Sequence, residues 1–203
     1  MPLLFVFDMD DVLYAYDWRV RMSGLSALTG LDLAELRRRW WHDDGEWAAE
    51  AGRFPTAEDY HAAVSAAFGV TVSVEDWIAN RRSGMTPIPG SIAAVGRARE
   101  LGAVSLLTNN GPLIQAHLPL LAPEIAPLFG DQLRTSSHYG ARKPDPLVFE
   151  RMLVSYGADP AEVFFADDLE PNVEAARSVG ITAHRFLEPT ALLAAIEDFA
   201  AGR

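Results

Sequence analysis

Short apolar runs that end in acidic or polar residues recur along the chain. Residues 3–7 are five consecutive apolar residues, too few for a helix, and Asp8 follows at once. Runs of this length without a polar face are typical of strands that are buried in a parallel sheet. Similar runs, of which the second is the weakest, cover residues 103–107, 133–136, 163–166 and 181–186.

Helical patterns separate these expected strands. Ser91 is a candidate cap for a helix that ends near Gly102, and Asp145 with Pro146 is typical of the start of another helix. A third helix is expected over residues 171–180. Strands that alternate with helices predict an α/β fold, in which a Rossmann-like open and mostly parallel sheet carries helices on both faces.

Residues 14–84 interrupt that alternation, because their pattern is helical. Asp32 and Glu35 form a capping box, Thr56 can open a second helix and Ser73 a third. This insert contains all five tryptophans, most of which we expect in its core. A polar cluster, expected at a solvated helix end, consists of His42, Asp43, Asp44 and Glu46. The pattern thus predicts two units, a Rossmann-like core of residues 1–13 and 85–203 and a small helical bundle of residues 14–84.

Composition limits what these units can do. With 203 residues and 49% hydrophobic content, the chain is long enough to bury a substantial core. The formal charge of −11 argues against nucleic acid or an anionic membrane as a partner. No apolar run approaches about 18 residues, and no basic leader precedes the first strand, so we expect a cytoplasmic protein.

Carboxylates gather at two expected strand ends. Asp8, Asp10 and Asp11 follow the first strand, and Asp167 with Asp168 follows a later one. Parallel strands end at the same edge of a sheet, so these mutually repelling acids would meet there, which indicates either a bound cation or a reaction that uses them. The chain has no cysteine, so a metal must be bound through oxygen or imidazole, and several carboxylates suit Mg²⁺.

Lys143 stands out because it is the single lysine of a chain with 16 arginines. It lies just before the helix that Asp145 is expected to cap. An ammonium group is a compact charge with three donors, which can bridge a carboxylate and a phosphoryl oxygen where a planar guanidinium does not fit. The exception therefore indicates a chemical role for this position.

These segments resemble the four motifs of the haloacid dehalogenase superfamily, in the same order along the chain. The first motif, a strand followed by DxDx[TV], is matched by residues 8–12, and the second, a Thr at a strand end, by Thr108. The third, [RK]KP with a later aromatic residue, is matched by residues 142–144, and the fourth, DDxxxN, by residues 167–172. Position 11 is often Gly in the superfamily; here it is Asp, whose side chain restricts the backbone of the loop.

The resemblance implies a magnesium-dependent enzyme that transfers a phosphoryl group through an aspartyl phosphate. Asp8 would be the nucleophile, and Asp10 would act first as acid and then as base. Dehalogenating members lack the second aspartate, so Asp10 favours phosphoryl transfer. Thr108, Asn109 and Lys143 would hold the phosphoryl group. The implied metal ligands are Asp8, Asp168 and Asp167, with a contribution from Asp10 through a nearby backbone carbonyl.

The resemblance also implies that residues 14–84 form a helical cap over the catalytic end of the sheet. A cap of this helical form resembles that of phosphatases that act on small-metabolite monoesters such as sugar phosphates. Trp18 and Arg19 follow the nucleophile closely and are the first candidates to touch the leaving group. A phosphomutase would use the same residues, and a catalytically idle binding module is the third interpretation, although Asp8 and Asp10 speak against it. We expect the partner to be a small phosphate ester, and we expect no binding to nucleic acid or membrane. The sequence does not identify which ester is the substrate, nor the oligomeric state.

Overall fold

The computed structural model describes residues 3–202, and at its centre lies a four-stranded parallel sheet. Its strands are β1 (Leu4–Phe7), β4 (Ala103–Leu106), β5 (Val163–Asp167) and β6 (Thr182–Arg185), in the order β4-β1-β5-β6. Phe7 pairs with Leu106 on one side and with Ala166 on the other, so β1 is an inner strand. The predicted α/β fold with a parallel sheet is confirmed.

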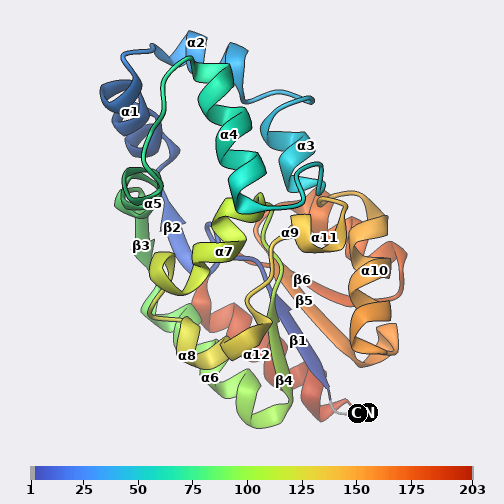
Figure 1. The fold of residues 1–203 in the computed structure, drawn as a ribbon. Helices are drawn as coiled ribbons and strands as arrows, with labels where there is room; N and C mark the ends of the chain where they lie inside the picture. Colours follow the sequence, from blue (N-terminus) through green and yellow to red (C-terminus); the bar gives the residue numbers. More distant parts are fainter. Residues whose placement is uncertain (1–2, 203) are drawn as a thin grey trace.

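Helices cover both faces of this sheet (Figure 1). One face carries α6 (Pro89–Leu101) and α12 (Pro189–Ala201), and the other carries α10 (Pro146–Tyr156) and α11 (Glu170–Ser178). Phe5 and Phe7 belong to the core on the α6 and α12 side, whereas Leu4 and Val6 belong to the core on the other side. Successive side chains of a strand point to opposite faces, so a strand buried on both faces is apolar throughout.

The helices of the insert lie beyond the carboxyl ends of the strands (Figure 1). They are α1 (Trp18–Thr29), α2 (Leu33–Arg39), α3 (Glu46–Glu50), α4 (Ala57–Phe68) and α5 (Val74–Ser83). An antiparallel ribbon of β2 (Tyr14–Tyr16) and β3 (Met85–Pro87) joins them to the sheet. Asp32, Thr56 and Ser73 accept hydrogen bonds at the starts of α2, α4 and α5, so these three predicted helix starts are confirmed.

The apolar core of the insert continues into α7 (Pro112–Leu121), which follows β4. Val64 of α4 and Trp77 of α5 belong to the same buried cluster as Leu113 and Ile114 of α7. Apolar contacts between buried side chains therefore hold the insert against the part of the chain that carries the sheet. Among the tryptophans, Trp40 and Trp77 are buried, Trp18 and Trp41 are partly buried, and Trp47 is exposed.

One expected helix start and one expected strand are wrong. Ser91 does not cap α6, because the helix already begins at Pro89, and Ser91 is buried inside it. Residues 133–136 do not form a strand: only Thr135 makes an isolated bridge. The side chain of Gln115 accepts from Thr135 N and donates to Leu133 O, so it satisfies backbone groups that a neighbouring strand would otherwise bind.

The remaining helical elements are short. They are α8 (Ala126–Phe129), the 3₁₀ turn Gly130–Gln132, α9 (Ser136–Tyr139) and the 3₁₀ turn Pro160–Glu162. Within residues 3–202, none of the helices has both the length and the apolar surface that crossing a membrane requires.

Candidate active site

A cavity of about 290 Å³ opens at the carboxyl ends of β1, β4 and β5. Most of the candidate site residues line it together: Asp8, Asp10, Thr108, Asn109, Lys143 and Asp168. The parallel order of the strands produces this convergence, because each strand carries its polar end to the same edge of the sheet. The chain thus brings residues from four separate segments of the sequence to one cavity.

Lys143 lies at the centre of the charged groups, with only 1% of its side chain exposed. Its Nζ donates to Asp167 Oδ2 at 2.6 Å and forms an ion pair with Asp8 Oδ1 at 2.9 Å. Burial acts to lower the pKa of Lys143, but the carboxylates of Asp167 and Asp8 outweigh it and raise that pKa above its ordinary value. The lysine is therefore held as a cation between two aspartates.

Asp8, which follows β1, is itself buried. Burial raises the pKa of Asp8 well above its ordinary value; the ammonium of Lys143 opposes this effect, and the neighbouring carboxylates of Asp167 and Asp10 add to it. A buried carboxyl group that repels its neighbours becomes protonated unless a cation stabilises its charged form. Lys143 supplies one such positive charge, and a metal ion would supply a second.

Asp167 and Asp168 stand at the end of β5 and differ in their contacts. Asp167 Oδ1 accepts from the backbone N–H of Leu169 at 2.9 Å and from Asn172 Nδ2 at 2.8 Å, while its other oxygen binds Lys143. Asp168 is partly buried, and burial followed by the charge of Asp167 raises its pKa to about 6. Both oxygens of Asp167 are thus bound by protein groups, whereas no side chain among residues 3–202 binds the carboxylate of Asp168.

These carboxylates fit a divalent metal ion. Asp8, Asp167 and Asp168 each offer an oxygen, and the three oxygens lie within 4.8 Å of one another. Carboxylate oxygens are hard donors, the kind that Mg²⁺ prefers, and two or three of them beside a phosphate make a common magnesium site. The carboxylate of Asp10 lies outside this group, so only its backbone carbonyl is left for the metal contact that we expected near Asp10.

Thr108 and Asn109 form the loop that follows β4. Thr108 is buried, and its Oγ1 accepts from Asn110 Nδ2 at 2.9 Å, so the hydroxyl hydrogen is free to donate into the cavity. Asn109 uses both ends of its amide on Lys143, donating to its carbonyl at 2.8 Å and accepting from its backbone N–H at 2.9 Å. Asn109 therefore fixes the backbone of Lys143 from the neighbouring loop.

Arg81, at the end of α5, is a site residue that the sequence did not indicate. Its Nη2 donates to both carboxylate oxygens of Asp10, at 2.7 and 2.6 Å. The guanidinium is 1% exposed and lies 3.8 Å above the ring of Tyr16. The sequence pattern does not distinguish Arg81 from other arginines of the insert, because a charged residue near the end of a helix is common. Its position shortly before the chain re-enters the core is the one feature that could have indicated a role.

Asp11 adopts the backbone conformation that a glycine usually takes. Its φ is 57°, the single positive φ of a non-glycine residue within residues 3–202. Asp tolerates this conformation better than most residues because its short side chain can bind the backbone locally. Here Asp11 Oδ1 accepts from Tyr16 N at 3.0 Å, and Asp11 N donates to Tyr14 O. The substitution is accommodated by the β2 segment without displacing Asp8 or Asp10 from the cavity.

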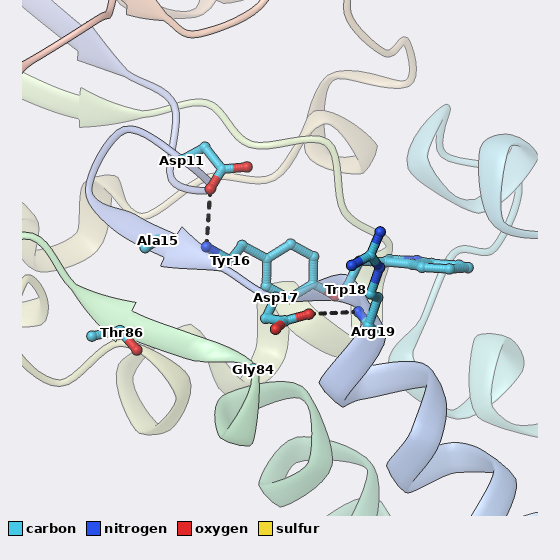
Figure 2. A pocket seen from close by; sticks show the side chains of 8 residues that line it. All are labelled: Asp11, Ala15, Tyr16, Asp17, Trp18, Arg19, Gly84 and Thr86. Carbon is cyan, nitrogen blue, oxygen red and sulfur yellow. Dashed lines mark hydrogen bonds between the residues drawn. The ribbon is translucent and has the colours of Figure 1, made fainter.

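Trp18 and Arg19 line a second cavity, of about 510 Å³, which shares Asp11 with the first. Figure 2 shows their side chains on the side of β2 and α1, with Tyr16 between them and Asp11. Arg37 lies over the indole of Trp18, with 4.8 Å from Cζ to the ring centroid. Both residues thus lie next to the first cavity and do not line it.

Arg142 connects the cavity to the insert. It lines the first cavity, and its Nε donates to Glu50 Oε2 of α3 at 2.6 Å. Glu46, one turn earlier, is buried and accepts from Trp40 Nε1 and from Tyr60 OH, each at 2.6 Å. The expectation of a solvated cluster is therefore wrong for Glu46, because the helix that carries it is folded against the centre of the insert.

Comparisons with known proteins agree with this geometry. The family model of haloacid dehalogenase-like hydrolases matches residues 3–180. Phosphatase MT3486 from Mycobacterium tuberculosis (strain CDC 1551 / Oshkosh) is 29% identical over 189 residues, which are 88% of this chain and 84% of that protein.

Solved structures show the same fold. The HAD family enzyme bt-2542 from Bacteroides thetaiotaomicron, crystallised with magnesium and inorganic phosphate, matches with a TM-score of 0.70 and 21% identity, over 91% of this chain and 94% of that chain. L-2-haloacid dehalogenase from Xanthobacter autotrophicus matches with a TM-score of 0.61 and 19% identity, over 94% of this chain and 80% of that chain. At such identities the likeness concerns the fold.

Proposed function

The chain belongs to the haloacid dehalogenase-like hydrolases, and we propose that it is a magnesium-dependent phosphatase of small phosphate monoesters. The observation that carries the proposal is the cavity in which Asp8 and Asp168 meet beside the ion-paired Lys143. The cavity offers a nucleophile, a metal-binding set and a phosphoryl-binding set within one space. Phosphatase MT3486 and the magnesium and phosphate complex of bt-2542 support this assignment.

In the proposed reaction, Asp8 attacks the phosphorus, the ester oxygen leaves, and an aspartyl phosphate is formed. Water then attacks that phosphorus and releases inorganic phosphate, so one difficult displacement is divided into two easier ones. Asp10 protonates the departing oxygen in the first half and takes the proton of the attacking water in the second. The hydroxyl of Thr108 and the ammonium of Lys143 donate to the equatorial phosphoryl oxygens.

Mg²⁺ would be held by Asp8 and Asp168, with Asp167 supporting the pair, since Asp167 already binds Lys143, Leu169 N and Asn172. When bound, the ion supplies positive charge that lets a carboxylate approach a phosphate dianion. Lys143 adds a second positive charge at a fixed position, and burial excludes water that would otherwise weaken both effects.

Phosphoryl transfer is preferred to dehalogenation, although dehalogenases share the fold. The chain has Asp10 and the carboxylates of a metal site, which a reaction at carbon does not need. Asp10 also lies on the cavity beside Asp8, where an acid for the leaving group is required. We propose further that residues 14–84 act as the cap that selects the leaving group, with Trp18 and Arg19 at its edge.

Release of p-nitrophenolate and phosphate from p-nitrophenyl phosphate, with and without Mg²⁺, tests the proposal. We expect turnover that requires the metal and that Asp8→Asn abolishes. Isomeric product from a sugar monophosphate, without free phosphate, would instead identify a mutase. Absence of turnover by the folded, magnesium-loaded protein on p-nitrophenyl phosphate and on several alkyl phosphates would refute a phosphatase.

A further inference from the structure

Arg142 is a cation on the catalytic cavity whose donors are mostly free. Its Nε is used by Glu50, and its two Nη groups have no hydrogen-bond partner among residues 3–202. About a third of its side chain is exposed. A guanidinium that is bound through Nε keeps its end-on pair of Nη groups, which point away from the partner as a planar fork. The contact with Glu50 thus orients the fork and leaves it free to bind.

The other two cations near this cavity are less suited to a further ligand group. Lys143 lies between Asp8 and Asp167 and is the proposed donor to the phosphoryl group. Arg81 donates through Nη2 to both oxygens of Asp10; its Nε and Nη1 have no hydrogen-bond partner among residues 3–202, but they are buried, and Arg81 does not line the cavity. Within the described part of the chain, Arg142 is therefore the cavity-lining cation whose two Nη groups carry no hydrogen bond. The cavity also carries several carboxylates, so an anionic ligand needs this charge in addition to any metal ion.

Glu50 fixes Arg142 from the side of the insert. Ser136 Oγ donates to the backbone carbonyl of Glu50 at 2.7 Å, so α3 is attached to the same loop region as Arg142. The indole of Trp47 lies 5.9 Å from the guanidinium carbon. The phosphoryl group would lie at the strand ends, beside Asp8. Arg142 lines the same cavity but is held by the insert, which makes it a candidate to contact the rest of the substrate.

We propose that Arg142 recognises a carboxylate on the leaving group, and that Glu50 is its positioning residue; this rests on the phosphatase function proposed above. A planar fork of two N–H groups matches the two oxygens of a carboxylate better than a single hydroxyl. The cavity, at about 290 Å³, lies at the small end of the range for ligand sites, so the ester is small. The substrate class is therefore a short phosphomonoester that carries a carboxylate.

The test compares two esters that differ in one group, phosphoglycolate and 2-hydroxyethyl phosphate. We expect the wild-type protein to prefer phosphoglycolate in kcat/KM, and Arg142→Gln to reduce that preference about tenfold to a hundredfold, the usual loss for a charge-assisted bidentate contact. Arg142→Lys should keep part of the preference, because it retains charge without the fork. Arg53→Gln, a substitution of the same kind at an exposed arginine of the insert, should leave the ratio unchanged.

Glu50→Gln should reduce the preference less than Arg142→Gln, and mainly through KM, because it loosens the fork without removing it. Ethanediol bisphosphate serves as a third substrate. If Arg142→Gln affects only this ester, the group recognised is a second phosphate and the carboxylate proposal is wrong. An unchanged ratio of phosphoglycolate to 2-hydroxyethyl phosphate in Arg142→Gln also overturns it.

Inhibition of wild-type p-nitrophenyl phosphate hydrolysis gives a measurement that does not depend on how the variants fold. Glycolate should inhibit more strongly than ethylene glycol, and equal inhibition would contradict the proposal. The two proposals fail separately. Loss of all phosphate release refutes the phosphatase, whereas normal release from p-nitrophenyl phosphate without any carboxylate preference refutes only the role of Arg142.

Discussion

Replacing Lys143 by Met removes the charge between Asp8 and Asp167 while it keeps a side chain of similar length. The lost contacts are those of Nζ at 2.6 and 2.9 Å, in a position that is 1% exposed. Removing one partner of a buried ion pair costs about 3–5 kcal/mol of stability, because the other charge stays buried without compensation. We expect a loss of this size at pH 7.5 and a fall in kcat of at least about 10²-fold.

The pH dependence of that loss follows from Asp8. Burial holds the pKa of Asp8 above its unfolded value, and the ammonium of Lys143 opposes the increase, so the variant should raise this pKa further. A folded pKa above the unfolded one gives stability at low pH that is lost as pH rises through the folded pKa. The stability difference between wild type and Lys143→Met should therefore be smaller at pH 5 than at pH 7.5.

Urea unfolding at the two pH values, in the absence of metal, measures the difference. Lys143→Arg is the matched control for charge. It should lose less stability than Lys143→Met, because it keeps a positive charge between the two aspartates. It should still lose most of the activity, because a planar guanidinium cannot occupy the position of the ammonium above Phe165. Equal stability of Lys143→Met and wild type at pH 7.5, or full activity of folded Lys143→Arg, would refute the reasoning.

Three further predictions concern the metal, the two aspartates and the insert. Exhaustive chelation should abolish p-nitrophenyl phosphate hydrolysis and Mg²⁺ should restore it; full activity without metal would contradict the metal site. Asp8→Asn should end transfer from every ester, whereas Asp10→Asn should release about one p-nitrophenolate per site in a rapid burst and then turn over slowly, with phosphate on Asp8 detected by mass spectrometry. Steady, undiminished turnover by Asp10→Asn would show that the roles are wrong. Burial and the charge of Glu46, opposed by Arg142, raise the pKa of Glu50 to about 7, so the stability due to Glu50 is lost as pH rises through 7. The Tm of wild type should therefore fall relative to Glu50→Gln between pH 5.5 and 8.5, and parallel Tm curves would rule this out.

The parts of the site that the sequence predicted are those with a local signal. Asp8, Thr108 and Asp167 each follow an apolar run, and a parallel sheet necessarily brings such strand ends together. Lys143 was identified by its rarity in an arginine-rich chain. Helix starts at Asp32 and elsewhere in the insert were predicted because a capping side chain binds backbone only a few residues away.

The parts that could not be predicted depend on contacts between distant segments. Arg81 meets Asp10 across 71 residues, and no pattern near either residue indicates the pair. Glu46 is buried because Trp40 and Tyr60 bind its carboxylate, whereas its acidic neighbours in the sequence suggested a solvated helix end. Burial of a polar side chain is decided by the partners that the fold supplies.

Within residues 3–202, two charged contacts join the insert to residues that line the first cavity, and both end on residues that we assign to the reaction or to its selectivity. Arg81 of α5 binds Asp10, and Glu50 of α3 binds Arg142, across 71 and 92 residues of sequence. Moving the insert away from the sheet would break both pairs and would also expose apolar surface shared with α7. The position of the insert therefore determines where the side chains of Asp10 and Arg142 are held. With the roles proposed above, proton transfer by Asp10 and leaving-group recognition by Arg142 both depend on contacts between insert and core, so a substrate that displaces the insert would weaken both.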